Sequence, residues 1–290
     1  MPRAFPISRR RFLETSAAAV AWSAWPSLAV AREAGFQIGV CDWSLGKLCD
    51  VGAFEIAKEL NLDGVQVSLG TAANDMALRQ PTVQAEFQAA SKRTGVAIAS
   101  LAIGELNQAP YKSDPRTVAW VADSIDVAQA LGVTVVLLAF FGKGDLRDDP
   151  KGVDTVVQRL RDVAPKAEKT GVVLGLETWL SGPEHLDIIE RVGSSAVQVY
   201  YDLGNSHLRG YDIYREIREL GTDHICEFHA KDYEFIFGEG KVDFPAARKA
   251  MDDIGYRGWI QIEGAKPLGL MDSYRKNEAY LRSVFPRTVA

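Results

Sequence analysis

The sequence is poor in cysteine and histidine, the residues that build disulfide frameworks, redox pairs and many zinc sites. Its 290 residues contain three cysteines, Cys41, Cys49 and Cys226, an odd number without C-x-x-C spacing. Cys41 and Cys226 lie in apolar runs, so we expect them to be buried thiols. A disulfide between Cys41 and Cys49 is the alternative if the protein is exported to an oxidising compartment.

The chain also lacks an excess of positive charge, a glycine-rich nucleotide motif and an internal linker. Its net charge of −5 gives no electrostatic basis for gripping a nucleic acid backbone. No G-x-G-x-x-G motif follows the first strand-like run, which disfavours a dinucleotide-binding fold. Because no Pro/Gly/Ser-rich stretch divides the chain after its N-terminal segment, we expect one domain.

Residues 1–31 have the pattern of an export signal. Arginines 9–11 precede a short apolar run, Phe12 to Trp25, which is followed by the small-x-small sequence Ala29-Val30-Ala31. This order is typical of a cleaved signal, and the apolar run is too short to span a bilayer. The paired arginines before Phe12 and Leu13 resemble a twin-arginine (Tat) signal, although Glu14 stands where such signals often carry lysine.

These features predict export by the Tat machinery, cleavage near Ala31 and a periplasmic mature protein of residues 32–290. The signal carries four arginines and one glutamate, so its removal would change the net charge from −5 to −8. A disordered, mildly basic tail is the alternative interpretation. No other stretch is long and apolar enough to predict a membrane span.

Eight strand-like runs alternate with helix-like segments along the rest of the chain. Several of these runs are almost continuously apolar, as is typical of parallel strands covered on both faces. The runs are residues 36–42, 64–69, 96–103, 133–140, 172–178, 197–202, 224–230 and 258–263.

The intervening segments carry helix start and stop signals. Residues 114–132 begin with Asp-Pro and end with glycine, and residues 149–171 repeat this pattern, with Pro165 predicting a kink or break. Residues 243–255 and 272–285 supply the last two helices. Eight strand–helix units predict an α/β fold, a closed (β/α)8 TIM barrel over residues 32–290, with a doubly wound open sheet as the alternative.

Four metal-ligand-type residues stand at the ends of four consecutive predicted strands: Glu177, Asp202, His229 and Glu263. Because the carboxyl ends of barrel strands meet at one face, we expect these side chains to converge. Three carboxylates and one imidazole suit a single divalent cation, with Mn²⁺ favoured and Mg²⁺, Co²⁺ or Zn²⁺ as alternatives.

Each of these residues alone also has a structural explanation. Glu177 could pair with a lysine, Asp202 could cap the following helix, and His229 could be a satisfied core histidine. Glu263 could be an ordinary loop charge. Their joint position at matching strand ends is what favours a metal site.

The sequence resembles the xylose isomerase-like TIM barrel superfamily, the sugar phosphate isomerase/epimerase group. The sharpest match is "HAKDYEFIFGEGKVDFPAARKAMDDIGYRGWIQIEG", residues 229–264, and "GLET" and "YYDLGN" match the strand 5 and strand 6 signatures. The resemblance implies that one divalent metal binds at the four positions named above. It also implies that Glu177 and Glu263 are catalytic and move protons on opposite faces of the substrate.

Three departures from the ketose 3-epimerases of this group concern the substrate shell. Pro183 stands where those enzymes carry a second glutamate, Asn205 where they carry histidine, and Phe235 where they carry arginine. The endonuclease IV-like branch needs a histidine-rich zinc cluster, and this chain has four histidines in all. We therefore do not expect free-ketose 3-epimerisation or DNA repair.

The expected chemistry is proton abstraction next to a carbonyl, with the enediolate stabilised by the cation. The leading hypothesis is an exported sugar isomerase or epimerase, an enzyme of carbohydrate metabolism acting on a non-phosphorylated sugar. A lyase that eliminates from an oxidised (3-keto) sugar or glycoside is the second. An exported, non-catalytic sugar-binding protein with a structural metal is the third. The oligomeric state is left open.

Further residues are candidates for substrate binding, each with a structural alternative. Trp43 and Trp179 could form an apolar wall against a sugar ring or pack in the core. Asn205 and His207 could contact hydroxyl groups or serve as turn residues. Lys231 could neutralise an oxyanion or form an ordinary salt bridge. Lys143, Lys231 and Lys266 could together form an anion site, whereas Gly238 and Gly240 are expected to form a turn.

Overall fold

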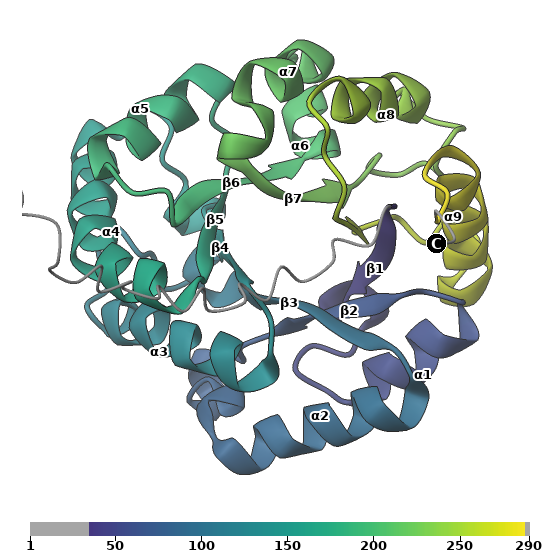
Figure 1. Ribbon diagram of the computed structural model, residues 1–290, viewed down its shortest axis with the longest axis horizontal. Helices are drawn as coiled ribbons and strands as arrows, with labels where there is room; N and C mark the ends of the chain where they lie inside the picture. Colours follow the sequence, from purple (N-terminus) through teal and green to yellow (C-terminus); the bar gives the residue numbers. More distant parts are fainter. Residues whose placement is uncertain (1–34, 288–290) are drawn as a thin grey trace, which may run out of the picture. The chain divides into compact units, whose positions relative to one another are not determined.

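The computed structural model describes residues 35–287, whose strands close into a parallel barrel in the order β1 to β8 (Figure 1). Closure is direct, because β1 pairs with β8 as well as with β2 and Ile38 lies opposite Ile260. The strands are β1 Gln37–Cys41, β2 Gly64–Ser68, β3 Ala97–Ile103, β4 Val135–Ala139, β5 Val173–Glu177, β6 Val197–Asp202, β7 Ile225–Ala230 and β8 Trp259–Ile262. The TIM barrel is confirmed, and the open sheet is wrong.

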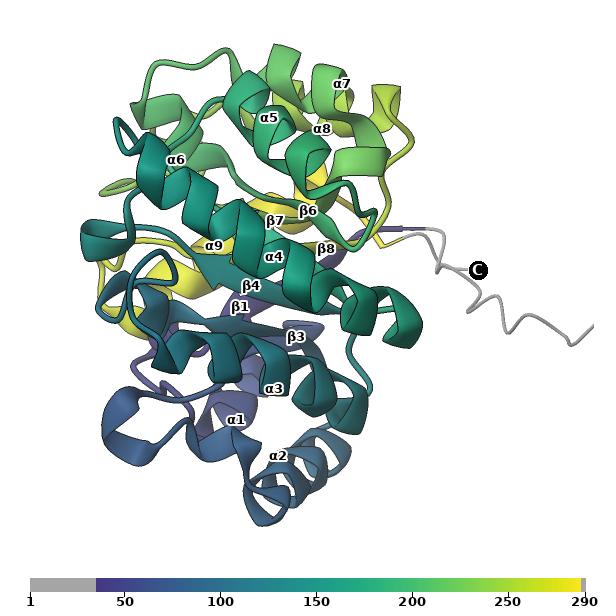
Figure 2. The ribbon, with the colours of Figure 1, turned by 90° about the vertical axis from the view of Figure 1, so that its left-hand side faces the viewer.

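Helices surround the barrel, and α3, α4 and α5 lie side by side across its outside (Figure 2). Within residues 35–287 the α-helices are α1 Gly52–Glu59, α2 Pro81–Thr94, α3 Arg116–Leu131, α4 Pro150–Thr170, α5 Gly182–Val192, α6 Leu203–Leu208, α7 Ile213–His224, α8 Phe244–Asp253 and α9 Leu270–Val284. Short 3-10 helices lie in the loops: η1 Trp43–Leu45, η2 Ala72–Asn74, η3 Ala77–Arg79, η4 Gly104–Asn107 and η5 Gly142–Gly144. None of these helices has the length and apolar character that a membrane crossing requires.

The predicted helix starts are formed by aspartate side chains. Asp149 caps α4 by accepting a hydrogen bond from the backbone N–H of Gly152 at 2.9 Å, and Pro150 occupies the first helical position. Helix α3 begins one residue beyond Pro115, and Asp114 accepts from the N–H of Arg116. The predicted break at Pro165 is wrong, because α4 continues through that residue to Thr170.

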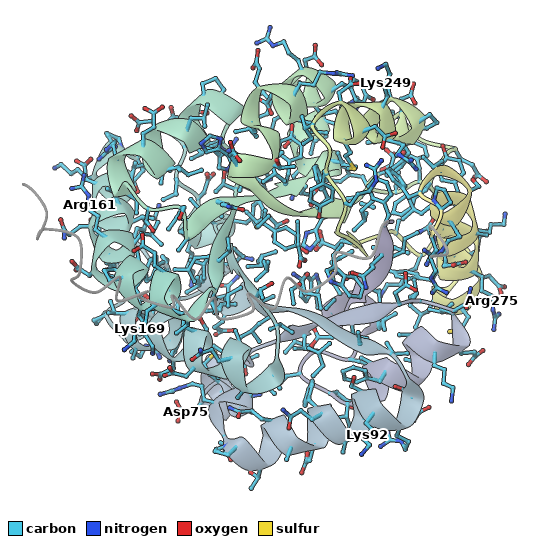
Figure 3. The ribbon with its side chains drawn as sticks, in the orientation of Figure 1. Asp75, Lys92, Arg161, Lys169, Lys249 and Arg275 are labelled. Carbon is cyan, nitrogen blue, oxygen red and sulfur yellow. The ribbon has the colours of Figure 1, made fainter. Side chains whose placement is uncertain are left out.

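The strands divide their side chains between two cores, as their period of two requires. Outward-facing residues such as Val65, Val67 and Ile260 pack against the helices. Inward-facing residues of β3, β4 and β6 form a separate apolar cluster of Ala102, Val135, Leu137, Ala139 and Tyr200. Charged side chains such as Arg161, Lys169 and Lys249 extend from the outer faces of the helices (Figure 3).

The three cysteines are free thiols, so the alternative of a Cys41–Cys49 disulfide is wrong. Cys41 is buried, as expected, and Cys226 is partly buried. The predicted export signal lies outside the described residues. Export, cleavage near Ala31 and the domain boundary there therefore stay predictions.

Asp42 anchors the loop after β1 to the end of β2. Its buried carboxylate accepts hydrogen bonds from the backbone N–H groups of Cys49 at 2.9 Å and Ser68 at 2.7 Å. The Ser68 hydroxyl donates a third, at 2.6 Å. Burial raises the pKa of Asp42 to about 6, although these hydrogen bonds oppose the shift. The loop held in this way carries Trp43, which faces the carboxyl end of the barrel.

We expect Asp42→Ala to destabilise the fold, because it leaves two backbone N–H groups without their acceptor. Each buried unsatisfied group costs roughly 1–3 kcal/mol, so the free energy of unfolding should fall by about 2–5 kcal/mol in urea titration. Asp42→Asn is the matched control, since its carbonyl oxygen keeps both backbone bonds and the Ser68 hydroxyl can accept from the new amide. Equal losses in the two variants would contradict this role.

Candidate metal centre and cavity

The barrel brings the four predicted ligands together at the carboxyl ends of its strands. Glu177 and Asp202 are the last residues of β5 and β6, His229 is the penultimate residue of β7, and Glu263 directly follows β8. One ligand atom from each of the four lies within 4.8 Å of the others. Two ligands on one ion are at most ~4–5 Å apart at the metal–oxygen distances of hard divalent cations, so the four residues could bind one ion together.

The imidazole of His229 presents Nδ1 to the three carboxylates. Nδ1 lies 3.0 Å from Glu177 Oε1, 3.8 Å from Glu263 Oε2 and 3.9 Å from Asp202 Oδ2. The ring itself is fully buried and lies 4.6 Å from the ring of Tyr200. A nitrogen donor among three oxygen donors suits Mn²⁺, Mg²⁺, Co²⁺ or Zn²⁺, and the donor set does not select one of them.

Asp202 fulfils both roles that the sequence leaves open for it. Its Oδ1 accepts from the backbone N–H of Asn205 at 2.8 Å and so caps α6. Its Oδ2 faces the cluster and accepts from the Asn205 side-chain amide at 2.8 Å. Burial raises the pKa of Asp202 to about 7, Glu177 and Glu263 add to the rise, and Lys231 opposes it.

Lys231 is the positive group of the cluster. Its Nζ lies 2.6 Å from Glu263 Oε2 and 3.6 Å from Asp202 Oδ2. Burial disfavours its charge, but the two carboxylates outweigh burial and raise the ammonium pKa above its ordinary value. Burial likewise disfavours ionised Glu263, yet Lys231, His229 and a hydrogen bond from Trp43 Nε1 at 2.8 Å lower its pKa to about 2. Glu263 is therefore a carboxylate at neutral pH.

A cavity of about 490 Å³ opens over this cluster. Glu177 and Glu263 line it and Asp202 and His229 do not, although Glu177, 4% exposed, is almost as buried as Asp202, 3% exposed. The other lining residues are Trp43, Leu48, Ser68, Gly70, Thr71, Gly104, Glu105, Asn107, Leu137, Ala139, Phe141, Trp179, Asn205, Leu208, Lys231 and Tyr233. The two glutamates are thus the ligand-type residues that a molecule in the cavity can touch.

The structure brings four of the five predicted substrate-binding residues to this cavity. Trp43, Trp179, Asn205 and Lys231 line it, and Trp179 packs edge-to-face against Phe141 with ring centroids 5.1 Å apart. His207 does not line it. It lies on α6, near Asp232. Burial raises the pKa of the Asp232 carboxyl group, and the nearby His207 partly opposes this rise. The predicted contact between His207 and substrate hydroxyls therefore has no geometric support.

The predicted lysine anion site is not assembled either. Lys143 lies in η5, exposed, and is absent from the cavity lining, while Lys266 lines a shallower neighbouring opening with Lys231. Among the described residues, Lys231 is the one cationic side chain lining the main cavity, where it pairs with carboxylates.

Several residues of the site were not predicted from the sequence. Tyr233 donates a hydrogen bond to Asn205 Oδ1 at 2.9 Å, and Glu105 and Asn107 line the cavity from η4. Gln66 and Glu227 lie inside the barrel beneath the cluster. Their signal in the sequence is a polar residue at an inward-facing position of an otherwise apolar strand.

Residues 54–284 match the family described as "Xylose isomerase-like TIM barrel". The chain belongs to this family. A 2-epi-5-epi-valiolone 7-phosphate 2-epimerase of Actinoplanes sp. (strain ATCC 31044 / CBS 674.73 / SE50/110) is 28% identical over 200 residues, which cover 68% of this chain and 72% of that protein. The resemblance seen in the sequence is thus confirmed at the level of the family.

Two solved structures share the fold. A D-psicose 3-epimerase from Clostridium cellulolyticum H10 superposes with a TM-score of 0.71 at 18% identity, covering 86% of this chain and 98% of that one. A 3-keto-D-glucoside 4-epimerase from E. coli gives a TM-score of 0.68 at 17% identity, covering 86% and 99%. At these identities the likeness concerns the barrel rather than the substrate.

We expect the affinity for Mn²⁺ to fall as the pH drops below about 7. Asp202 has a raised pKa of about 7, so below that pH it holds a proton that an incoming cation must displace. Calorimetric titration in buffers of different protonation enthalpy should therefore detect more protons released on binding near pH 6 than near pH 8, where Asp202 is already ionised. An affinity that does not change between these pH values would contradict this expectation.

Proposed function

We propose that the protein is a divalent-metal-dependent sugar isomerase or epimerase acting on a non-phosphorylated sugar. The observation that carries the proposal is the division of the ligand cluster. Glu177 and Glu263 line the cavity, while Asp202 and His229 do not. Two carboxylates facing one cavity can handle the two proton transfers that isomerisation requires. The epimerase names of the relative and of the two solved structures agree with this chemistry.

Glu177, Asp202, His229 and Glu263 would hold the cation, which when bound supplies Lewis-acid polarisation of a substrate carbonyl. One of the two glutamates takes the proton from the carbon next to that carbonyl, and the released electron pair moves to the carbonyl oxygen. Lys231, charged and at the cavity wall, stabilises the developing negative oxygen. Return of a proton to the opposite face gives the epimer, and return to the neighbouring carbon gives the isomer.

The charge of the cavity wall supports a substrate without phosphate. In the described chain its lining holds three acidic side chains, Glu105, Glu177 and Glu263, against Lys231. These carboxylates would repel a phosphate dianion, and Lys231, the one cationic side chain of the described lining, is paired with Glu263. The proposed export to the periplasm, based on residues 1–31, agrees with this.

A lyase acting on an oxidised glycoside is the second candidate function. The apolar side chains at the mouth of the cavity support it. Leu48 and Leu208 line the cavity although they are 46% and 62% exposed. Apolar side chains at this place could contact an apolar aglycone. With a leaving group on the carbon beyond the deprotonated one, the same electron pair would expel it instead of accepting a proton.

The proposal is tested by incubating the purified protein and Mn²⁺ with free sugars and 3-keto glycosides in D₂O and following NMR spectra. Metal-dependent deuterium incorporation into recovered sugar supports isomerisation, and release of an aglycone supports elimination. Binding of sugar and metal without turnover would support the third hypothesis, a sugar-binding protein with a structural metal.

Glu263→Gln should lower kcat by about 10²–10⁴-fold, the usual contribution of a general acid or base, while the thermal unfolding temperature changes little. The amide keeps the shape, and its one oxygen can accept from either Trp43 or Lys231, but it cannot take a proton. Glu86→Gln, an exposed position on α2, is the matched control and should keep wild-type activity. Wild-type turnover by Glu263→Gln would exclude Glu263 as an acid–base group.

Matched free and phosphorylated forms of an accepted sugar should differ in kcat/KM, with the free sugar preferred. The acidic lining and the paired state of Lys231 are the physical reason. A kcat/KM that favours the phosphorylated form by tenfold, about 1.4 kcal/mol, would overturn the charge argument.

A further inference from the structure

A layer of hydrogen-bonded polar side chains fills the barrel interior beneath the metal-ligand cluster. Gln66 of β2, Ser100 of β3, Tyr200 of β6 and Glu227 of β7 are all buried, with exposed fractions of 0–3%. Gln66 lies opposite Ser100, and Tyr200 lies opposite Glu227, in the registers of their strand pairs. The mechanism proposed above uses none of the four.

Both hydroxyl groups of this layer donate their hydrogens to Glu227. Ser100 Oγ and Tyr200 OH both donate to the same oxygen, Glu227 Oε2, at 2.9 Å. Burial raises the pKa of Glu227 to about 7, and a proton held on the other oxygen, Oε1, would leave Oε2 an acceptor for both hydroxyls. Each hydroxyl has a single hydrogen, so each donates that hydrogen to Glu227. Towards any other neighbour, the two oxygens can then act only as acceptors.

Because both hydroxyl groups donate to Glu227, the orientation of the Gln66 amide is fixed. One end of the amide lies 3.2 Å from Ser100 Oγ and 3.0 Å from Tyr200 OH. Because both oxygens accept, that end must be the NH₂ group, which has a hydrogen for each of them. The reverse orientation would set a carbonyl oxygen against two hydroxyls whose hydrogens are already used. The amide oxygen of Gln66 therefore faces His229.

The amide oxygen in turn determines which nitrogen of His229 carries the hydrogen. Gln66 Oε1 lies 2.8 Å from Nε2 and also accepts from the Cys41 thiol at 3.3 Å. A carbonyl oxygen cannot donate, so Nε2 must be an N–H. Nδ1 faces Glu177, Asp202 and Glu263 and, without a cation, donates a hydrogen to Glu177 Oε1 at 3.0 Å. A bound cation would replace that hydrogen and use the lone pair of Nδ1.

We infer that Gln66, oriented by Ser100, Tyr200 and Glu227, is a positioning residue that holds His229 in the Nε2–H form and so directs Nδ1 to the divalent cation. This inference rests on the metal centre of the proposed function. The effect of Glu227 reaches the metal site through two intervening steps, without contact between Glu227 and the bound ion. Partners of this kind typically change metal affinity 10–100-fold when they are removed.

Two variants test the two ends of this chain of contacts. Gln66→Met keeps a similar volume but removes the acceptor of the Nε2 hydrogen, and it should weaken Zn²⁺ binding by 10–100-fold in competition titrations. Glu227→Gln can donate to the hydroxyls, which lets the Gln66 amide reverse and the His229 hydrogen move to Nδ1. It should weaken Zn²⁺ binding even though no ligand has changed.

Glu216→Gln is the matched control. Glu216 is also a buried carboxylate, and it accepts from Tyr201 OH at 2.7 Å and from the Gly182 N–H at 2.8 Å, but it lies on α7 outside the barrel. It should keep wild-type Zn²⁺ affinity, whatever stability it loses. An equal loss of affinity in Glu216→Gln and Glu227→Gln would show a general structural effect and overturn the inference.

Long-range ¹H–¹⁵N NMR of the Zn²⁺-loaded protein supplies a readout that is independent of activity. Wild-type His229 should show a slowly exchanging hydrogen on Nε2 and zinc on Nδ1, and Gln66→Met should lose the protection of that hydrogen. Zinc on Nε2, or wild-type affinity and spectra in both variants, would overturn the inference alone. If the wild-type protein binds no divalent ion, the metal centre fails, and the inference with it. If Gln66→Met does not fold, the Zn²⁺ affinity and the NMR spectrum of Glu227→Gln decide whether the inference holds.

Discussion

Electrostatic repulsion among three carboxylates is the constraint on which the end of the barrel depends. One oxygen from each of Glu177, Asp202 and Glu263 lies within 4.8 Å of the other two. Like charges this close cannot all ionise unless positive charge is near. When a cation binds and His229 is neutral, Lys231 supplies one charge against three, which leaves two negative charges that a divalent cation would neutralise. Burial and the neighbouring glutamates raise the pKa of Asp202, whereas Lys231 and His229 lower that of Glu263.

The strand period of two connects this cluster to the barrel interior. Residues two positions apart face the same way, so Glu227, His229 and Lys231 form a column along one side of β7, as Tyr200 and Asp202 do on β6. Barrel interiors usually hold branched apolar residues, and β4 follows that rule with Val135, Leu137 and Ala139. The interior below the ligands is instead polar and buried, which is costly unless its groups are paired. The hydrogen bonds from Ser100 and Tyr200 satisfy that requirement for Glu227, whereas the amide of Gln261 on β8 is buried without a hydrogen-bond partner among the described residues.

The sequence predicts what depends on local pattern and chain order. Apolar runs locate the eight strands to within two residues, and four ligand-type residues at successive strand ends identify the cluster, because a barrel brings those ends together. The orientation of individual side chains depends on contacts between distant residues. Gln66 and His229 are in contact across 163 positions, and His207 does not line the cavity although it lies only five residues after Asp202. Pro165 shows the same limit for the backbone, since the helix around it tolerates a residue that disfavours helices in isolation.

The order of the strands explains why the two glutamates, rather than Asp202 and His229, face the cavity. The ligands come from β5, β6, β7 and β8, which are neighbours in the closed barrel and form an arc at its rim. Glu177 and Glu263 stand at the two ends of that arc, whereas Asp202 and His229 occupy its middle. The middle pair is covered by its neighbours and held by Asn205 and Gln66, so it can fix the position of a cation without touching a substrate. The end pair approaches the space above from two sides. An arrangement that transfers a proton between two faces of a sugar needs that separation, and four consecutive strands provide it without any further element.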